Sequence, residues 1–225
     1  MNIPPYLLAA KVADQPLDYK WDVNIKNRLL TADADSKPAL AKALGKISAK
    51  AAFAFAVASA EWIVARLSRH TDVADALLRV EAAWAATLDP HYAKLPKPQV
   101  ANPVKADRAA GPVYYAMLLL SELHERYLAG ATSHVYLSAL VLGAFAEHVA
   151  GRNPVFKRWV PEVLKRAHEQ YPKSAKPLAE QPDVARELFA SDAPDQATLT
   201  SSRTKLLASM KSAENPYLTP ALRNG

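Results

Sequence analysis

Residues 51–60 constrain the fold more than any other part of this chain, because they read AAFAFAVASA and carry no charge. A helix of this composition is apolar on every side, so other elements must surround it. The wider composition also favours helix: 44 Ala and 28 Leu stand against 4 Ile, and unbranched side chains lose little rotamer freedom in a helix. We therefore predict an all-α fold, an irregular multi-helix bundle whose longest helix runs from an N-cap at Ser36 to about His70.

An antiparallel helical hairpin is the second predicted feature. Residues 111–128 and 132–150 both have helical patterns, and the turn Ala129-Gly130-Ala131 separates them. A further helix is expected at 73–88, where one face is apolar and Asp72 can cap the start. We expect the most buried segments to be 51–62 and 135–146, in which Phe55 or Leu140 could not be replaced by a charged residue without a large loss of stability.

The prolines divide the chain. Five of them lie between residues 89 and 112 and exclude a continuous helix there. We predict one helical domain over residues 1–225, with an N-terminal half (1–88), a Pro-rich crossover (89–112) and a C-terminal half (113–225). Short helical pieces are expected after Pro154 and again after Pro161, and weak ones at 183–189 and 200–210.

Residues 17–26 alternate apolar and polar side chains, a period of two that is typical of a half-buried strand. Helix is the alternative, since every fourth residue from 17 to 29 is also apolar. A strand here leaves an edge unpaired, and three mates are open: residues 99–104, the same segment in a homodimer, or a partner's edge. We predict a short N-terminal strand in a protein–protein contact, anchored by Trp21 with Tyr19 on the same face.

Several common chemistries are missing from this chain. It contains no Cys, which excludes disulfides, Cys-ligated metal centres and a cysteine nucleophile. It also lacks the glycine-rich loops that bind nucleotide phosphates, the Gly-x-Ser-x-Gly turn of hydrolases, and the His-Glu-x-x-His and Glu-x-x-His spacings of metal sites. We therefore expect no catalytic residue, no metal and no cofactor.

Histidine is the remaining route to enzyme chemistry. Pairing the hairpin helices places His134 one helical turn from His124, so the two imidazoles could touch. With Glu122 or Glu125 they could hold a metal, although a catalytic zinc needs three protein ligands and an open position. An enzyme with a His-dependent site on the 112–150 hairpin is thus an alternative to a non-enzymatic function.

Positive charge is unevenly distributed. The chain has a net charge of +6, and residues 152–177 hold seven Lys and Arg against two Glu. Basic residues interleaved with Phe156, Trp159 and Tyr171 are what phosphate binding and base stacking use, so a nucleic-acid-binding protein is a second alternative. No recognised nucleic-acid-binding motif accompanies this basic segment.

A second basic feature indicates a protein partner. Lys42, Lys46 and Lys50 recur every four residues with no acidic residue among them. Such a stripe either keeps a surface helix soluble or contacts an acidic surface, on the hairpin of this chain or on a partner. Together with the N-terminal segment and the 152–177 segment, this stripe makes up the set of residues predicted to bind a partner: Trp21, Tyr19, Lys42, Lys46, Lys50, Arg158, Lys165 and Arg166.

The remaining expectations concern location and function. The continuously apolar part of the uncharged stretch 127–146 is only about twelve residues, short of the roughly 20 that span a bilayer. With no signal-like pattern at the N-terminus, we expect no membrane span and a cytoplasmic location. The absence of catalytic motifs predicts a non-enzymatic protein-binding module, such as a bacterial immunity-type or adaptor protein, whose partner has an acidic surface.

Overall fold

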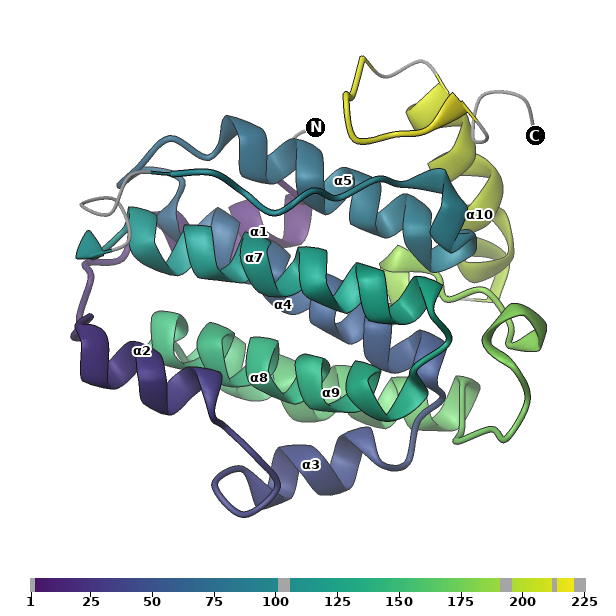
Figure 1. Cartoon of the computed structure of the whole chain (residues 1–225), viewed down its shortest axis with the longest axis horizontal. Coiled ribbons are helices and arrows are strands. Elements are labelled where there is room, and N and C mark those ends of the chain that lie inside the picture. The colour runs from purple at the N-terminus through teal and green to yellow at the C-terminus, as the bar shows by residue number, and fades with distance from the viewer. Residues whose placement is uncertain (1–2, 101–105, 191–195, 212–213, 221–225) are drawn as a thin grey trace.

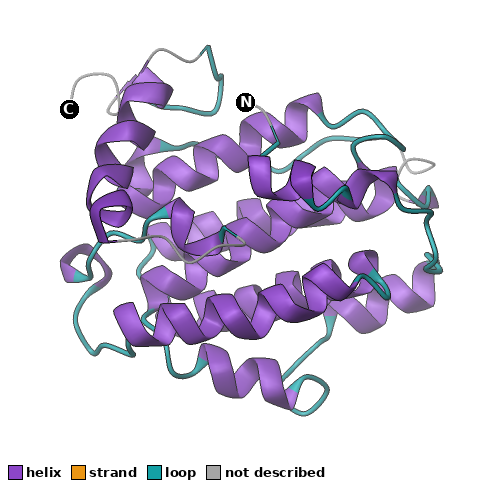
Figure 2. Ribbon diagram, turned by 180° about the vertical axis from the view of Figure 1, so that it is seen from behind, coloured by secondary structure: helices purple, strands orange, loops and turns teal. Residues whose placement is uncertain are grey.

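The computed structural model describes residues 3–100, 106–190, 196–211 and 214–220, and these residues form helices and no strand (Figures 1 and 2). The prediction of an all-α multi-helix bundle is confirmed. The α-helices are α1 (Pro5–Ala9), α2 (Val23–Leu30), α3 (Pro38–Leu44), α4 (Ala49–Leu67), α5 (Ala74–Leu88), α7 (Ala110–Leu128), α8 (Thr132–Ala150), α9 (Pro154–Gln170) and α10 (Gln196–Lys211). Short 3₁₀ helices lie between them: η1 (Val12–Asp14), η2 (Pro90–Tyr92), η3 (Leu178–Glu180) and η4 (Arg186–Phe189).

Helix α4 is the centre of the bundle, and every one of its residues is buried. Helices α5, α7 and α8 pack against it, as Figure 1 shows. The all-round apolar segment 51–60 requires this arrangement, and residues 51–62 are buried throughout as expected. In α8, residues 139–146 are buried but Leu137 is half exposed, so the expectation for 135–146 holds for its second part.

The predicted continuous helix from Ser36 to His70 is wrong, because the chain breaks between Gly45 and Ser48 into α3 and α4. Ser36 does not cap α3; it exchanges hydrogen bonds with Asp33 instead. Ser48 caps α4 by accepting a hydrogen bond from the Ala51 N–H at 3.2 Å. The Ser48 N–H itself donates to the Tyr171 carbonyl oxygen at 2.9 Å, so a distant segment stabilises the break.

The predicted N-terminal strand at 17–26 is also wrong. Residues 17–22 have no regular structure, and α2 begins at Val23 behind Asp22, whose carboxylate accepts from the Ile25 N–H at 2.8 Å. This cap starts a helix in the middle of the alternating pattern. From Val23 onward the chain is therefore helical, in agreement with the apolar residues at every fourth position. Residues 99–104 were one possible pairing partner for this strand, and residues 101–104 of that segment lie outside the described residues.

The hairpin prediction is confirmed by α7 and α8, which are joined by a turn at Gly130 with φ of +68°. Helix α9 differs from its prediction, because one helix runs through Pro161 instead of restarting there. Its buried side chains lie on both sides of the proline, and their burial outweighs the one hydrogen bond that proline removes. These side chains are Phe156, Trp159, Val163, Leu164 and Ala167.

Residues 89–100 of the predicted Pro-rich crossover are irregular apart from the short η2, residues 101–105 lie outside the described residues, and α7 begins inside the predicted range. Helix α7 begins at Ala110, where the Asp107 carboxylate accepts hydrogen bonds from the N–H groups of Ala109 and Ala110 at 2.8 and 2.7 Å. The weak helices expected near 183–189 and 200–210 correspond to η4 and α10. Among the described residues, no helix has the length and apolar character needed to cross a membrane.

Phe55→Asp tests the central position of α4. Phe55 is completely buried, so the new carboxylate would have no partner, and we expect a loss of about 3 kcal/mol or more in the free energy of unfolding. Val23→Asp is the control, because Val23 is 62% exposed at the first position of α2, where an acidic residue is favourable. Urea unfolding followed by circular dichroism measures both. Equal destabilisation of the two variants would contradict this architecture.

Gly151→Ala tests a backbone constraint at the end of α8. Gly151 has φ of +59°, and a Cβ there would lie 2.5 Å from Asp18 Oδ1. We expect the substitution to lower the free energy of unfolding by about 1–3 kcal/mol. Gly45→Ala is the matched control: Gly45 has φ of −62°, and a Cβ there would make only ordinary contacts, so the stability should be unchanged or slightly higher. Thermal unfolding that shifts equally in both variants would refute the constraint.

Candidate functional site

An apolar pocket of about 360 Å³ lies where α3 and α9 meet above α4 and α8. Its volume is within the range of about 300–1,000 Å³ that is typical of binding sites. Gly143 of α8 forms part of its wall, and a Cβ there would lie 2.9 Å from the Leu40 side chain. The other lining residues are Lys37, Pro38, Ala39, Leu40, Ala43, Phe55, Glu147, Phe156, Lys157, Val160, Pro161 and Leu164.

Lysines supply most of the charge at this pocket. Lys37 Nζ lies 2.6 Å from Glu147 Oε2 in an ion pair that is partly exposed to solvent. Lys157 is exposed and makes no ion pair within the described part of the chain. The pocket therefore combines an apolar interior with an unpaired positive charge at its edge.

Further basic residues surround the pocket. On α3, Lys42 follows the lining residue Pro38 by one helical turn and is exposed. On α9, Arg158 and Lys165 lie one turn before and one turn after Pro161, and both are exposed. Lys165 Nζ lies 3.9 Å from Glu169 Oε1, and an exposed surface pair of this kind contributes little to stability.

Backbone pairing brings the two basic segments of the sequence together. The Lys173 N–H donates to the Lys46 carbonyl oxygen at 2.8 Å, and Ile47 and Pro172 form an isolated antiparallel bridge. The same Lys46 carbonyl lies 3.1 Å from His168 Nδ1. The end of α3 and the end of α9 are thus joined, and their charges belong to one surface. We call this surface the α3–α9 face; its basic residues are Lys37, Lys42, Lys46, Lys157, Arg158, Lys165 and Lys173.

Two of the basic residues predicted to bind a partner do not belong to this face. Lys50 is buried at the start of α4, where its Nζ lies 2.6 Å from Asp183 Oδ1 and also donates to the carbonyl oxygen of Gln181 at 3.3 Å. Arg166 is partly buried, and its Nη2 donates to the Ala190 carbonyl oxygen at 2.7 Å. The predicted Lys42–Lys46–Lys50 stripe is therefore broken, because the chain changes direction between α3 and α4.

Tyr19 and Trp21 stabilise the fold from within. Tyr19 is buried, and its hydroxyl donates to the Arg108 carbonyl oxygen at 2.7 Å. Trp21 is half-buried, with its ring centroid 5.9 Å from that of Tyr115 and 6.0 Å from that of Phe145. These contacts attach the N-terminal segment to α7 and α8. Without a strand, the proposed edge pairing through Trp21 has no structural basis.

The histidines of the hairpin have separate surroundings. His124 is buried and its Nε2 donates to the Pro90 carbonyl oxygen at 2.9 Å, whereas His134 is exposed. His148 is half-buried, and its Nε2 donates to the Lys20 carbonyl oxygen at 2.8 Å. In the described residues, no three His, Asp or Glu side chains are grouped so that they could hold a metal ion.

A buried polar cluster around Glu61 of α4 was not predicted from the sequence. The Glu61 carboxylate pairs with the Arg186 guanidinium and accepts a hydrogen bond from Trp84 Nε1 at 3.3 Å. Burial raises the pKa of Glu61, and burial together with the Glu61 charge raises the pKa of Tyr6. In the sequence, the signal for this cluster was a glutamate within a mostly apolar helix. A buried carboxylate in that position needs a partner from elsewhere in the chain.

No family model matches this chain, and no curated protein or solved structure does so either. The function is therefore inferred from the chemistry of the surface itself. That chemistry is an apolar pocket with lysines and an arginine around it, contributed by two helices that are far apart in the sequence.

The lowered pKa values of two histidines predict that the folded chain loses stability in mild acid. Burial lowers the pKa of His124 and of His148, so the folded chain resists protonating them while the unfolded chain protonates near pH 6.5. Their contribution is fully present above about pH 6.5 and is lost as the pH falls towards the folded-state pKa. His124→Gln should reduce this loss between pH 7 and pH 5, measured by urea unfolding. His134→Gln, at an exposed position, is the control. If both variants reduced the pH dependence of the unfolding free energy equally, the burial of His124 would not be its cause.

Proposed function

We propose that this protein is a non-enzymatic protein-binding module that binds a partner with an acidic surface through the α3–α9 face. The observation that carries the proposal is the convergence of basic residues from two distant segments around one apolar pocket. Interfaces commonly combine a central apolar anchor with a polar rim, and complementary charge accelerates association. The partner's anchor is an apolar side chain that enters the pocket, and its carboxylates face the surrounding lysines.

The charge balance of the face supports an acidic partner. Residues 37–46 carry three Lys and no acidic residue, and residues 152–177 carry a net charge of +5. Lys157 at the pocket edge has no ion-pair partner in the described chain, so a carboxylate of the partner would meet an available cation. An adaptor or bacterial immunity-type role, in the cytoplasm, belongs to this class of function and is the finer form of the proposal.

The structure offers less to a nucleic acid on this face. Phe156 and Trp159 are buried, and Trp159 Nε1 donates to the Phe189 carbonyl oxygen at 2.8 Å. Neither ring is accessible for stacking on a base, which leaves the half-buried Tyr171 as the one partly exposed ring of the three named in that hypothesis. A protein partner uses the pocket as well as the charges, and for this reason we prefer it.

Charge reversal on the α3–α9 face tests the proposal. The bait is the full chain, used to capture partners from the source cells, and each candidate is then purified and its binding measured directly. Lys42→Glu with Lys157→Glu should weaken binding at least tenfold, mainly by slowing association, and wild-type binding should weaken as salt is raised. Arg28→Glu with Arg126→Glu is the matched control, because it changes the net charge equally at exposed positions of α2 and α7.

A pocket variant separates the apolar anchor from the charges. Ala39 is exposed at the pocket edge, so Ala39→Trp covers the entrance without disturbing the core. This variant should bind the purified partner at least tenfold more weakly while its unfolding free energy changes by less than about 1 kcal/mol. If the Lys42→Glu, Lys157→Glu variant binds no more weakly than its control, or if Ala39→Trp binds as the wild type does, the α3–α9 face is not the binding surface.

A further inference from the structure

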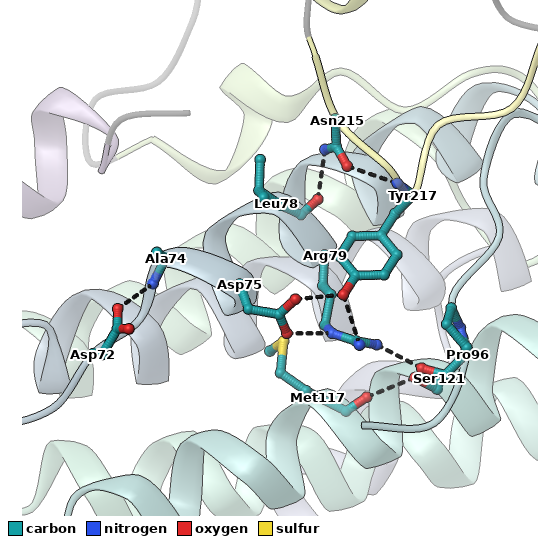
Figure 3. A network of polar contacts seen from close by, with 10 residues as sticks. All are labelled: Asp72, Ala74, Asp75, Leu78, Arg79, Pro96, Met117, Ser121, Asn215 and Tyr217. Atoms are coloured by element: carbon teal, nitrogen blue, oxygen red, sulfur yellow. Dashed lines mark hydrogen bonds and ion pairs between the residues drawn. The ribbon is translucent and has the colours of Figure 1, made fainter. Parts of the chain in front are cut away.

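Residues 214–219 lie against α5 and residues 91–96 and make specific polar contacts (Figure 3). Residues 215–218 form a turn, closed by a hydrogen bond from the Leu218 N–H to the Asn215 carbonyl oxygen at 3.2 Å, and residues 217–219 pair with residues 92–94. Asn215 is only 2% exposed. Its Nδ2 donates to the Leu78 carbonyl oxygen at 2.7 Å and to Glu81 Oε2 at 3.0 Å. Its Oδ1 accepts from the N–H of Tyr217 at 2.9 Å. An aspartate in this position could not make the two donor contacts, so the contact set is specific for the amide.

Tyr217 is recognised through both its ring and its hydroxyl. The hydroxyl donates to Asp75 Oδ1 and accepts from Arg79 Nη2 at 2.8 Å. The Arg79 guanidinium carbon lies 4.3 Å from the centre of the tyrosine ring, a cation–π contact. Figure 3 shows the ring lying over the guanidinium, between α5 and the extended residues near Pro96.

Main-chain pairing completes the recognition. The Lys94 N–H donates to the Tyr217 carbonyl oxygen at 2.8 Å, and the Thr219 N–H donates to the Tyr92 carbonyl oxygen at 3.0 Å. Ala93 and Leu218 form an antiparallel bridge, and Leu218 is buried. Residues 217–219 therefore pair with an exposed backbone edge as a bound peptide does, with main-chain bonds for affinity and side-chain sites for specificity.

Both ends of the groove edge have contacts of their own, separate from this segment. Arg79 is held by Asp75 at 2.6 Å and by the Pro96 carbonyl oxygen at 2.5 Å. The Ser121 hydroxyl lies 3.2 Å from the same Pro96 carbonyl, and His124 binds the Pro90 carbonyl. Helices α5 and α7 therefore hold Pro90 and Pro96, the two ends of the edge, through contacts that involve no residue after 213, whereas the backbone groups between them bond to residues 217–219.

We infer that the groove between α5 and residues 91–96 is a peptide-binding site for an Asn-x-Tyr-Leu turn, occupied here by residues 215–218 of the same chain. A partner segment with the same pattern exchanges with it. An empty groove is unfavourable, because Glu81 is buried and would lose the Asn215 amide. Exchange pairs these groups again once the new peptide is bound, so the occupant is replaced by another peptide of the same chemistry. The inference rests on residues separate from the α3–α9 face.

The test uses the full chain and a synthetic peptide. The probe is fluorescein-labelled ENPYLTP, the sequence of residues 214–220, and binding is followed by fluorescence anisotropy. In the wild type the tethered segment competes at high effective concentration, so the peptide should bind weakly. The double variant Asn215→Ala, Tyr217→Ala weakens the tethered segment and should bind the peptide at least tenfold more tightly. The matched peptide EAPALTP should not bind either protein measurably.

Two results would overturn the inference: a double variant that remains folded by circular dichroism but fails to bind ENPYLTP, or equal binding of the two peptides. If the double variant unfolds, Tyr217→Phe takes its place, with a smaller gain in peptide affinity expected and no gain overturning the inference. Hydrogen exchange of the wild type is an independent measurement. The Lys94 amide should exchange by local opening, faster than the amides of α4; exchange only by global unfolding would show that the segment does not leave the groove.

Discussion

The burial of α4 along its whole length imposes a requirement on the rest of the chain, because three of its side chains are charged. Lys50 binds Asp183, Glu61 pairs with Arg186, and Arg66 donates to the carbonyl oxygens of Gln15 and Pro16 at 2.7 and 2.6 Å. A buried charge without a partner costs several kcal/mol, so these contacts hold irregular segments from both ends of the chain against the central helix. The N-terminal residues and residues 181–190 are thereby part of the core structure.

The same requirement decides which charges remain available to a partner. Lys50 and Arg166 bind residues 181–190, so among the basic residues predicted to bind a partner those left exposed are Lys42, Lys46, Arg158 and Lys165. The α3–α9 face and the peptide groove lie on opposite sides of α4, as α3 and α5 do in Figures 1 and 2. The two proposed binding surfaces are therefore separate, and a partner on one does not cover the other.

Sequence patterns were reliable where a helix has a clear apolar face or clear ends. Helix α5, the α7–α8 hairpin and the buried middle of α4 follow from composition, spacing and the turn at Gly130. The sequence patterns gave wrong predictions where a helix cap or a contact with a distant residue decides the conformation. The Asp22 cap ended the alternating pattern at 17–26, and the pairing of Lys46 and Ser48 with residues 171–173 divided the predicted helix into α3 and α4. A local sequence pattern does not indicate a contact with a residue that is distant in the chain.

For the candidate binding surfaces too, some features follow from the sequence and others only from the tertiary structure. The sequence by itself determined that the fold is helical, that residues 51–60 are enclosed, and that positive charge is concentrated in residues 37–50 and 152–177, because these follow from side-chain chemistry and its period along the chain. The tertiary structure alone decided that Lys37 and Lys157 line one pocket, that Lys50 is buried, and that Asn215 and Tyr217 fill a groove on α5. Which charges pair internally depends on contacts between residues more than 100 positions apart, and only packing around α4 specifies them.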